Sequence, residues 1–259
     1  MKAGVSTASL YPELLEKAFI GLLENGVTTL EVFINTHSEL DKKYLQNLKR
    51  IADSYNAEIC ALHPFTCGIE PMMFFTEYEA RFKDIMEYYK KYFEAMNILG
   101  AEIFVFHGNN LLNDYPDEKY FERFLSLSEL GKNFGATVAQ ENVSRCSSGK
   151  LSFLKKMSLE LKDNAKFVLD LKQARRVGKN PNEFIDVLGK KIVHIHYSDG
   201  NETDNCLKFG EGNFNNVLMF DKLKQMEYNG KIILELYREN FVDLKDISDN
   251  FKMLKKQIN

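Results

Sequence analysis

The stretch KKIVHIHYSDG at residues 190–200 places two histidines, His194 and His196, inside a β-branched apolar run. Residues two apart in a strand point to the same side, so both imidazoles face one way and His196 lies nearer to the strand end. Asp199 follows three residues later. The stretch therefore combines the pattern of a buried strand with side chains that carry chemistry.

Seven further apolar runs occur along the chain, and the stretches between them show helical periodicity. The eight expected strands are KAGVS (2–6), TLEVFI (29–34), EICALH (58–63), EIFVFH (102–107), ATVAQE (136–141), KFVLD (166–170), KIVHIH (191–196) and KIILEL (231–236). Eight strands alternating with helices predict an α/β protein, a single (β/α)8 TIM barrel over residues 1–259.

An open doubly wound sheet is the rival architecture. It would usually have fewer strands, and a nucleotide-binding version should carry a glycine-rich turn after its first strand. Here the first strand leads into VSTASLYPE (5–13), and the chain has no GxGxxG or GxxxxGK[ST] motif. The barrel is therefore the preferred prediction.

The helical stretch 77–100 has an apolar stripe, which we expect to pack on the barrel; its members are Phe82, Ile85, Tyr89, Phe93 and Met96.

Composition narrows the class of protein. The formal net charge is −3 and no dense basic cluster occurs, which argues against nucleic-acid binding. The four cysteines form no CxxC pair, as expected in a reducing compartment. Neither a signal-peptide core nor an apolar run of about 18 residues is present, so we predict a cytoplasmic protein without membrane contact.

Acidic and imidazole side chains lie at or near the ends of seven of the expected strands. They are Glu31, His63, His107, Glu141, Asp170, His196 and Glu235. In a barrel of parallel strands these residues meet at the carboxyl-terminal end, the mouth, where barrel enzymes have their active sites. Crowded, buried carboxylates repel one another, and a bound cation would remove that cost. The pattern predicts a metal site.

Two glutamates, one aspartate and one histidine from the last four strands form a compact candidate ligand set: Glu141, Asp170, His196 and Glu235. Such a set suits one divalent ion, either Mn²⁺, Mg²⁺, Co²⁺ or Zn²⁺. His63 and His107 lie across the mouth and could hold a second ion or position a substrate. We expect His194 to pack inside the barrel, and Asp199 to orient a ligand or touch substrate.

Seven short motifs, one for each of several barrel units, resemble the xylose isomerase-like superfamily of TIM barrels. This superfamily joins sugar-phosphate isomerases and epimerases to the endonuclease IV type of DNA-repair enzyme. The motifs are LHPF (62–65), VFHGN (105–109), QENVS (140–144), VLDLKQA (168–174), HIHYSDG (194–200), KFGEGNF (208–214) and ILELY (233–237).

The resemblance implies the same four metal ligands, and it implies that Glu141 and Glu235 also move the proton. The metal would polarise the substrate, and proton transfer through a cis-enediolate would isomerise or epimerise a sugar or sugar phosphate. The expected partner is this small molecule. Whether several copies of the chain form a homo-oligomer is left open. The expected substrate contacts are Glu31, His63, His107, Gln173 and Asp199.

Two departures from the family pattern stand out. Gln173 occupies a position where family members usually have a histidine. The segment 200–214 lacks the Asp-x-His pair that helps the endonucleases build a trinuclear zinc cluster. Without that pair the DNA-repair interpretation loses its trinuclear cluster, but the endonucleases have histidines at the places of His63 and His107, so an endonuclease IV-like phosphodiesterase is kept as one alternative. Gln173 motivates the other alternative, a non-catalytic sugar-binding barrel.

Some features have two readings. The apolar segment PFTCGIEPMMFF (64–75) suits a lid over a small ligand or simple packing. Four basic residues are candidates for phosphate contacts, although solvated surface charge is the preferred explanation for each. They are Lys172, Arg175, Arg176 and Lys208.

Overall fold

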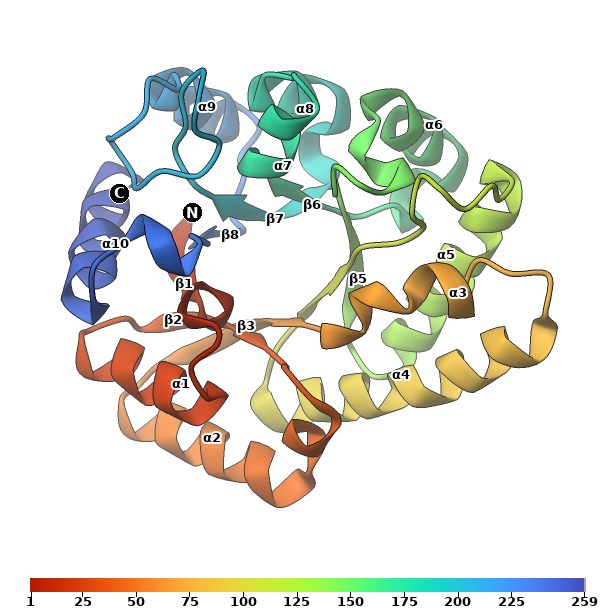
Figure 1. Cartoon of the computed structure of the whole chain (residues 1–259), viewed down its shortest axis with the longest axis horizontal. Helices are drawn as coiled ribbons and strands as arrows, with labels where there is room; N and C mark the ends of the chain where they lie inside the picture. Colours follow the sequence, from red (N-terminus) through yellow and green to blue (C-terminus); the bar gives the residue numbers. More distant parts are fainter. Residues whose placement is uncertain (259) are drawn as a thin grey trace.

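The computed structural model describes residues 1–258. Eight parallel strands form a closed barrel in sequence order, with the eighth strand paired to the first (Figure 1). The predicted (β/α)8 barrel is confirmed. The strands are β1 (Lys2–Ser6), β2 (Thr29–Phe33), β3 (Glu58–His63), β4 (Ile103–Phe106), β5 (Thr137–Glu141), β6 (Phe167–Asp170), β7 (Ile192–Tyr197) and β8 (Lys231–Leu234).

Three of the expected strands end earlier than the sequence pattern predicts, and β2 does so by one residue, at Phe33. β4 stops at Phe106, and His107 follows it, immediately before Gly108 with a φ of 90°. β8 stops at Leu234, although the N–H of Glu235 still donates to the carbonyl of Tyr197 on β7 at 3.0 Å. The backbone leaves the sheet after β4 and after β8, so the side chains of His107 and Glu235 stand at its rim.

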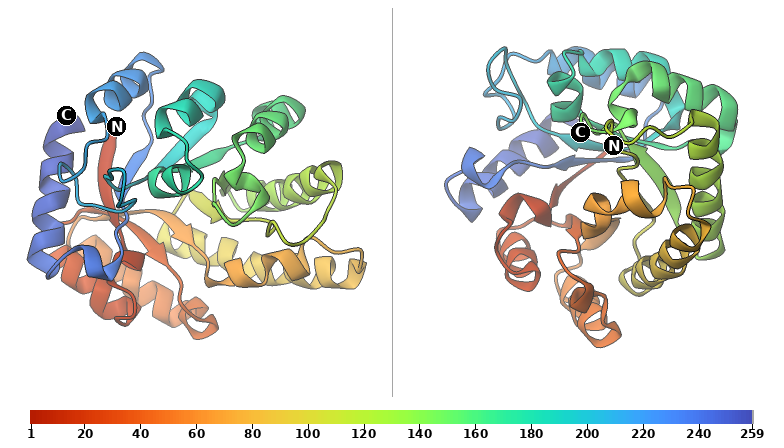
Figure 2. Two further views of the ribbon diagram at one scale, coloured as in Figure 1. Left: turned by 45° about the horizontal axis from the view of Figure 1, so that its top comes forward. Right: turned by 45° about the vertical axis from the view of Figure 1, so that its right-hand side comes forward.

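Helices surround the strands, and β1 lies beside α10 in all views (Figures 1 and 2). The helices are α1 (Leu15–Glu24), α2 (Lys42–Ser54), α3 (Glu70–Met73), α4 (Glu79–Leu99), α5 (Asp117–Asn133), α6 (Leu151–Leu161), α7 (Leu171–Arg176), α8 (Pro181–Leu188), α9 (Asn216–Gln225) and α10 (Leu244–Ile258). Within residues 1–258, none of the helices has the length and apolar character that crossing a bilayer requires.

The apolar stripe of α4 faces the barrel as predicted. Ile85, Tyr89, Phe93 and Met96 are buried in the main apolar core, and Phe82 packs at its edge. Tyr89 and Phe93 meet the ring of Phe104 on β4 edge-on.

Small apolar side chains fill the barrel beneath its mouth. Val105, Ala139 and Val168 form a separate buried cluster on three successive strands. Each lies two residues before a strand-end residue of the predicted site, so it points to the same side. These three polar residues of the mouth therefore stand on a packed apolar layer.

Candidate metal centre

The seven predicted strand-end residues converge at the mouth, and all seven side chains are buried. Glu31 and Asp170 are at most 1% exposed, whereas Glu235 and His107 keep 8% and 7% of their surface. The most accessible members of the cluster are therefore His107 after β4 and Glu235 after β8, which lie on opposite sides of the barrel.

The four residues of the predicted ligand set lie together. One ligand atom from each of Glu141, Asp170, His196 and Glu235 falls within 4.8 Å of the others. Nδ1 of His196 is the common point: it lies 3.0 Å from Oε1 of Glu141, 3.4 Å from Oε2 of Glu235 and 3.8 Å from Oδ2 of Asp170. Three carboxylates thus face one ring nitrogen.

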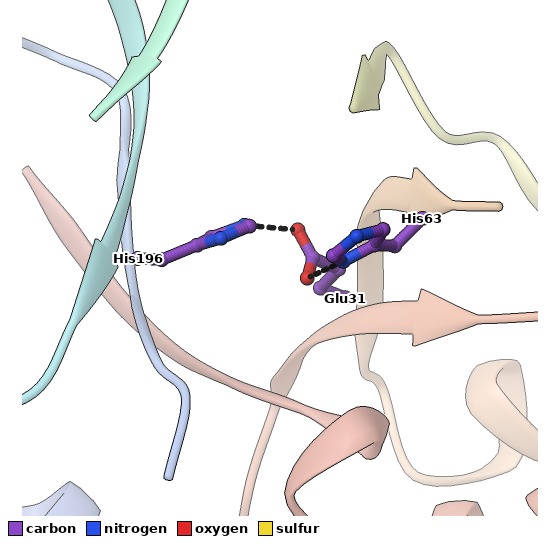
Figure 3. Close-up of side chains that lie close together, drawn as sticks. All are labelled: Glu31, His63 and His196. Carbon is purple, nitrogen blue, oxygen red and sulfur yellow. Dashed lines mark hydrogen bonds and ion pairs between the residues drawn. The ribbon is translucent and has the colours of Figure 1, made fainter. Parts of the chain in front are cut away.

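Glu31 orients the imidazoles around it. Its Oε2 contacts Nε2 of His196 at 3.0 Å and Nε2 of His194 at 2.9 Å. Its Oε1 accepts a hydrogen bond from the hydroxyl of Ser6 at 3.0 Å and lies 3.4 Å from Nδ1 of His63. Figure 3 shows the carboxylate between the rings of His196 and His63. The expected burial of His194 is confirmed.

This arrangement fits a divalent ion. Because Glu31 accepts a hydrogen bond from Nε2–H of His196, the lone pair on Nδ1 would point at the three carboxylates. Such an arrangement of lone pairs is stable only when a proton or a metal ion lies between them. Burial opposes protonation of His196, but the carboxylates of Glu31 and Glu235 outweigh it and raise its pKa well above the usual value. Three carboxylates and one imidazole are donors for Mn²⁺, Mg²⁺, Co²⁺ or Zn²⁺.

The carboxylates do not titrate alike. Burial raises the pKa of Asp170 to about 6, although Lys172 opposes the rise. Burial acts in the same direction on Glu141 and Glu235, but there it is outweighed: His196 holds the pKa of Glu141 well below its usual range, and Lys172 lowers that of Glu235. Both glutamates are therefore ionised at neutral pH.

A second group adjoins the first. Nε2 of His63 and Nε2 of His107 lie 2.8 Å apart, and the latter is 3.2 Å from Oε2 of Glu141. These three residues also have ligand atoms within 4.8 Å of one another. Burial lowers the pKa of His107 to about 3, so its ring is neutral and offers a lone pair. Glu141 belongs to both groups and could bridge two ions.

Lys172 belongs to the cluster, although the sequence analysis named it only as a candidate phosphate contact. Its side chain is 5% exposed, and Nζ donates to Oδ2 of Asp170 at 2.7 Å and to Oε2 of Glu235. The expectation of a solvated surface charge is wrong for this residue. Asp170 caps the start of α7 by accepting from the N–H of Gln173, and this short turn carries Lys172 back over the mouth. The signal was a lysine two residues after a strand-end aspartate.

Gln173 and Asp199 lie outside the cluster. The side-chain carbonyl of Gln173 accepts from the backbone N–H and the hydroxyl of Ser144, at 3.0 and 2.7 Å. The carboxylate of Asp199 accepts from the N–H groups of Gly200 and Gly210, at 2.8 and 2.9 Å, and so holds the loop after β7. Their predicted contacts with substrate stay predictions.

The segment 64–75 packs against its neighbours. Phe74 and Phe75 are buried and contact Phe106. Glu70 is also fully buried, and its carboxylate accepts from the N–H of Gly108 at 2.6 Å. This bond ties the segment to the residue that follows His107, so the segment supports the site from outside.

The comparisons with known proteins agree with the barrel fold. A family model described as a xylose isomerase-like TIM barrel matches residues 22–257. The uncharacterized protein MJ1311 of Methanocaldococcus jannaschii is 30% identical over 250 residues, which cover 91% of this chain and 83% of that protein.

Two solved structures share the fold. The crystal structure of a D-tagatose 3-epimerase-like protein has a TM-score of 0.79 and 24% identity, and the match covers 99% of each chain. The structure of an IolI protein with a bound zinc atom has a TM-score of 0.80 and 18% identity, covering 100% of this chain and 98% of that one. With its closed barrel and its match over 22–257, the chain belongs to the xylose isomerase-like TIM barrel family.

Proposed function

We propose that this protein is a divalent-metal-dependent isomerase or epimerase of a sugar or sugar phosphate. The observation that carries the proposal is the meeting of Glu141 and Glu235 with Asp170 and His196 in one buried cluster. The likeness to a D-tagatose 3-epimerase-like protein and to a zinc-bound barrel supports the same chemistry.

The two glutamates are the proposed proton carriers. Both are ionised at neutral pH, so either can remove a proton from the carbon beside a substrate carbonyl, which leaves a cis-enediolate of the sugar. The other glutamate, which takes up a proton from solvent before it acts, returns this proton to the opposite face of the same carbon and gives the epimer. Return of the proton to the former carbonyl carbon, with transfer of the enediolate's hydroxyl proton to its other oxygen, gives the isomer. A bound divalent ion would supply Lewis acidity towards the substrate oxygens.

Two of the proposed substrate contacts are less deeply buried than the rest of the cluster. His63 and His107 are 5% and 7% exposed, and their rings lie 4.7 Å apart. Neutral His107 can donate to or accept from a sugar hydroxyl, depending on its tautomer. Glu31, which is 0% exposed, acts on substrate only through the histidines it holds.

Exchange of solvent deuterium into a substrate carbon tests the proposal directly. Metal-stripped protein reloaded with Mn²⁺, Co²⁺ or Zn²⁺ is incubated in D₂O with a panel of free and phosphorylated ketoses, and the products are read by NMR. We expect metal-dependent exchange with at least one substrate class. Sugar binding without metal that survives Glu235→Gln, together with no exchange across the panel, would favour a non-catalytic sugar-binding barrel.

A second candidate function rests on the group formed by His63, His107 and Glu141. Two ions that share Glu141 would suit hydrolysis of a phosphodiester, as in two-metal sites. Against it stands the segment 200–214, which has no histidine to complete a trinuclear cluster. Nicking of a duplex with an abasic site, at low enzyme concentration and in the presence of Zn²⁺, would revive this alternative.

A further inference from the structure

Lys172 places an ammonium group on the predicted metal ligands. Its Nζ donates to Oδ2 of Asp170 at 2.7 Å and to Oε2 of Glu235, and the side chain is buried. A buried lysine is rare unless its charge is paired, and here both partners belong to the ligand set.

The oxygens that Lys172 binds are the ones that face His196. Nδ1 of His196 lies 3.8 Å from Oδ2 of Asp170 and 3.4 Å from Oε2 of Glu235. The third carboxylate, that of Glu141, is instead held by His196 itself at 3.0 Å. The ammonium thus binds two of the atoms that a metal ion in this set would bind, so the lysine and the ion compete for them.

We propose that Lys172 is a resident cation of this site, which a divalent ion must displace before it binds all four ligands. Without an ion, three buried carboxylates would repel one another, and the ammonium offsets that repulsion. The metal-free protein is therefore stable, and its affinity for the ion is lowered because binding breaks the two lysine contacts. The ring of Tyr237, 5.6 Å from Nζ, offers the displaced ammonium a cation–π partner outside the ligand set.

The inference rests on the metal site of the proposed function, but not on the identity of the sugar. Metal affinity therefore tests it without any substrate. Mn²⁺ binding to the metal-stripped full chain is measured by calorimetry for the wild type and for Lys172→Met, which keeps an unbranched side chain one atom shorter and removes its charge. The control is Lys156→Met, since Lys156 also bridges two carboxylates, Asp117 and Glu118, but lies on the exposed outer ring of helices.

We expect Lys172→Met to bind Mn²⁺ at least tenfold more tightly than the wild type, and Lys156→Met to bind as the wild type does. We also expect metal-free Lys172→Met to melt at a lower temperature, and saturating Mn²⁺ to raise its melting temperature more than that of the wild type. If the metal-free variant does not fold, the variant purified with Mn²⁺ is titrated with a competing chelator. Loss of the ion only at a higher chelator concentration than in the wild type supports the inference.

The other outcomes separate the inference from the proposed function. Equal or weaker Mn²⁺ binding by Lys172→Met would mean that the lysine supports the ligands instead of competing for them, and the proposed enzyme would still stand. Binding of Mn²⁺ by Lys172→Met but not by the wild type would support the inference and contradict metal-dependent catalysis by the natural chain. Uptake by neither protein, with Co²⁺ and Zn²⁺ tried as well, would overturn both.

Discussion

Glu31 on β2 and His196 on β7 are 165 residues apart in the chain, and the carboxylate of the first lies 3.0 Å from Nε2 of the second. The contact leaves Nδ1 of His196 directed at Glu141, Asp170 and Glu235. A carboxylate that holds the far nitrogen of a ligand histidine fixes its tautomer and ring orientation. Glu31 is therefore a positioning residue for the candidate metal centre.

Replacement of Glu31 by glutamine should weaken metal binding. The amide has no charge, and its NH₂ group replaces one of the two oxygens. It therefore cannot accept from the two histidines that meet at Oε2 and also from the hydroxyl of Ser6 that meets Oε1. We expect Mn²⁺ affinity to fall by about 10- to 100-fold, as measured by calorimetry. Glu58→Gln is the control, because Glu58 pairs with Lys2 and Lys231 at the opposite end of the barrel. Unchanged affinity in Glu31→Gln would show that His196 needs no such orientation.

The proton-transfer roles proposed for Glu141 and Glu235 predict that each glutamine variant loses deuterium exchange. Loss of one proton carrier should slow exchange by about 10²- to 10⁴-fold, measured on the first ketose that the wild type exchanges. Metal content of the same preparations, by elemental analysis, separates loss of the carrier from loss of the ion. Glu160→Gln, an exposed change on α6, should behave as the wild type. Full exchange by a metal-loaded Glu235→Gln would remove Glu235 from the mechanism.

Glu70 should make stability depend on pH. Burial raises its pKa from 4.5 to about 7, although the N–H of Gly108 and the hydroxyl of Tyr89 oppose the rise. A raised pKa means that the protonated form favours folding: this contribution is complete below pH 4.5 and is lost as the pH rises through about 7. The full loss in the free energy of unfolding between these two pH values is about 3 kcal/mol.

Glu70→Gln mimics the protonated carboxyl and should remove this dependence. In urea titrations between pH 4.5 and 8, the unfolding free energy of the variant should rise relative to the wild type as the pH increases. Glu77→Gln, an exposed carboxylate in the same region, should follow the wild-type profile. Parallel profiles for Glu70→Gln and the wild type would mean that Glu70 is ionised in the folded protein throughout this range.

Gly108 should tolerate no larger side chain. It adopts a φ of 90°, and a Cβ atom there would lie 1.9 Å from the hydroxyl oxygen of Tyr120. We expect Gly108→Ala to lower the unfolding free energy by at least about 2 kcal/mol in urea titrations, because strain and overpacking add. Gly178→Ala has a φ of 70° but no neighbour within 4 Å, so it reports the strain alone and should cost about 1 kcal/mol. Equal costs for the two variants would contradict the clash.

The barrel could be predicted from the sequence because its signals are local. Each apolar run and each amphipathic stretch reports its own secondary structure, and eight alternations leave one closed architecture that satisfies them. Parallel strands then bring their carboxyl ends together whatever the details of packing. For this reason the gathering of Glu141, Asp170, His196 and Glu235 followed from strand ends alone.

The partners of each side chain could not be predicted, because they depend on the closure of the barrel. Lys172 and Glu235 are 63 residues apart and meet only because α7 carries Lys172 back over the mouth, where its side chain reaches the residue that follows β8. Glu70 reaches the backbone of Gly108 across 38 residues through the packing of α3. The sequence by itself determined the fold and the donor atoms at its mouth. Only the tertiary structure decided which buried charges neutralise one another, because distances and desolvation set that balance.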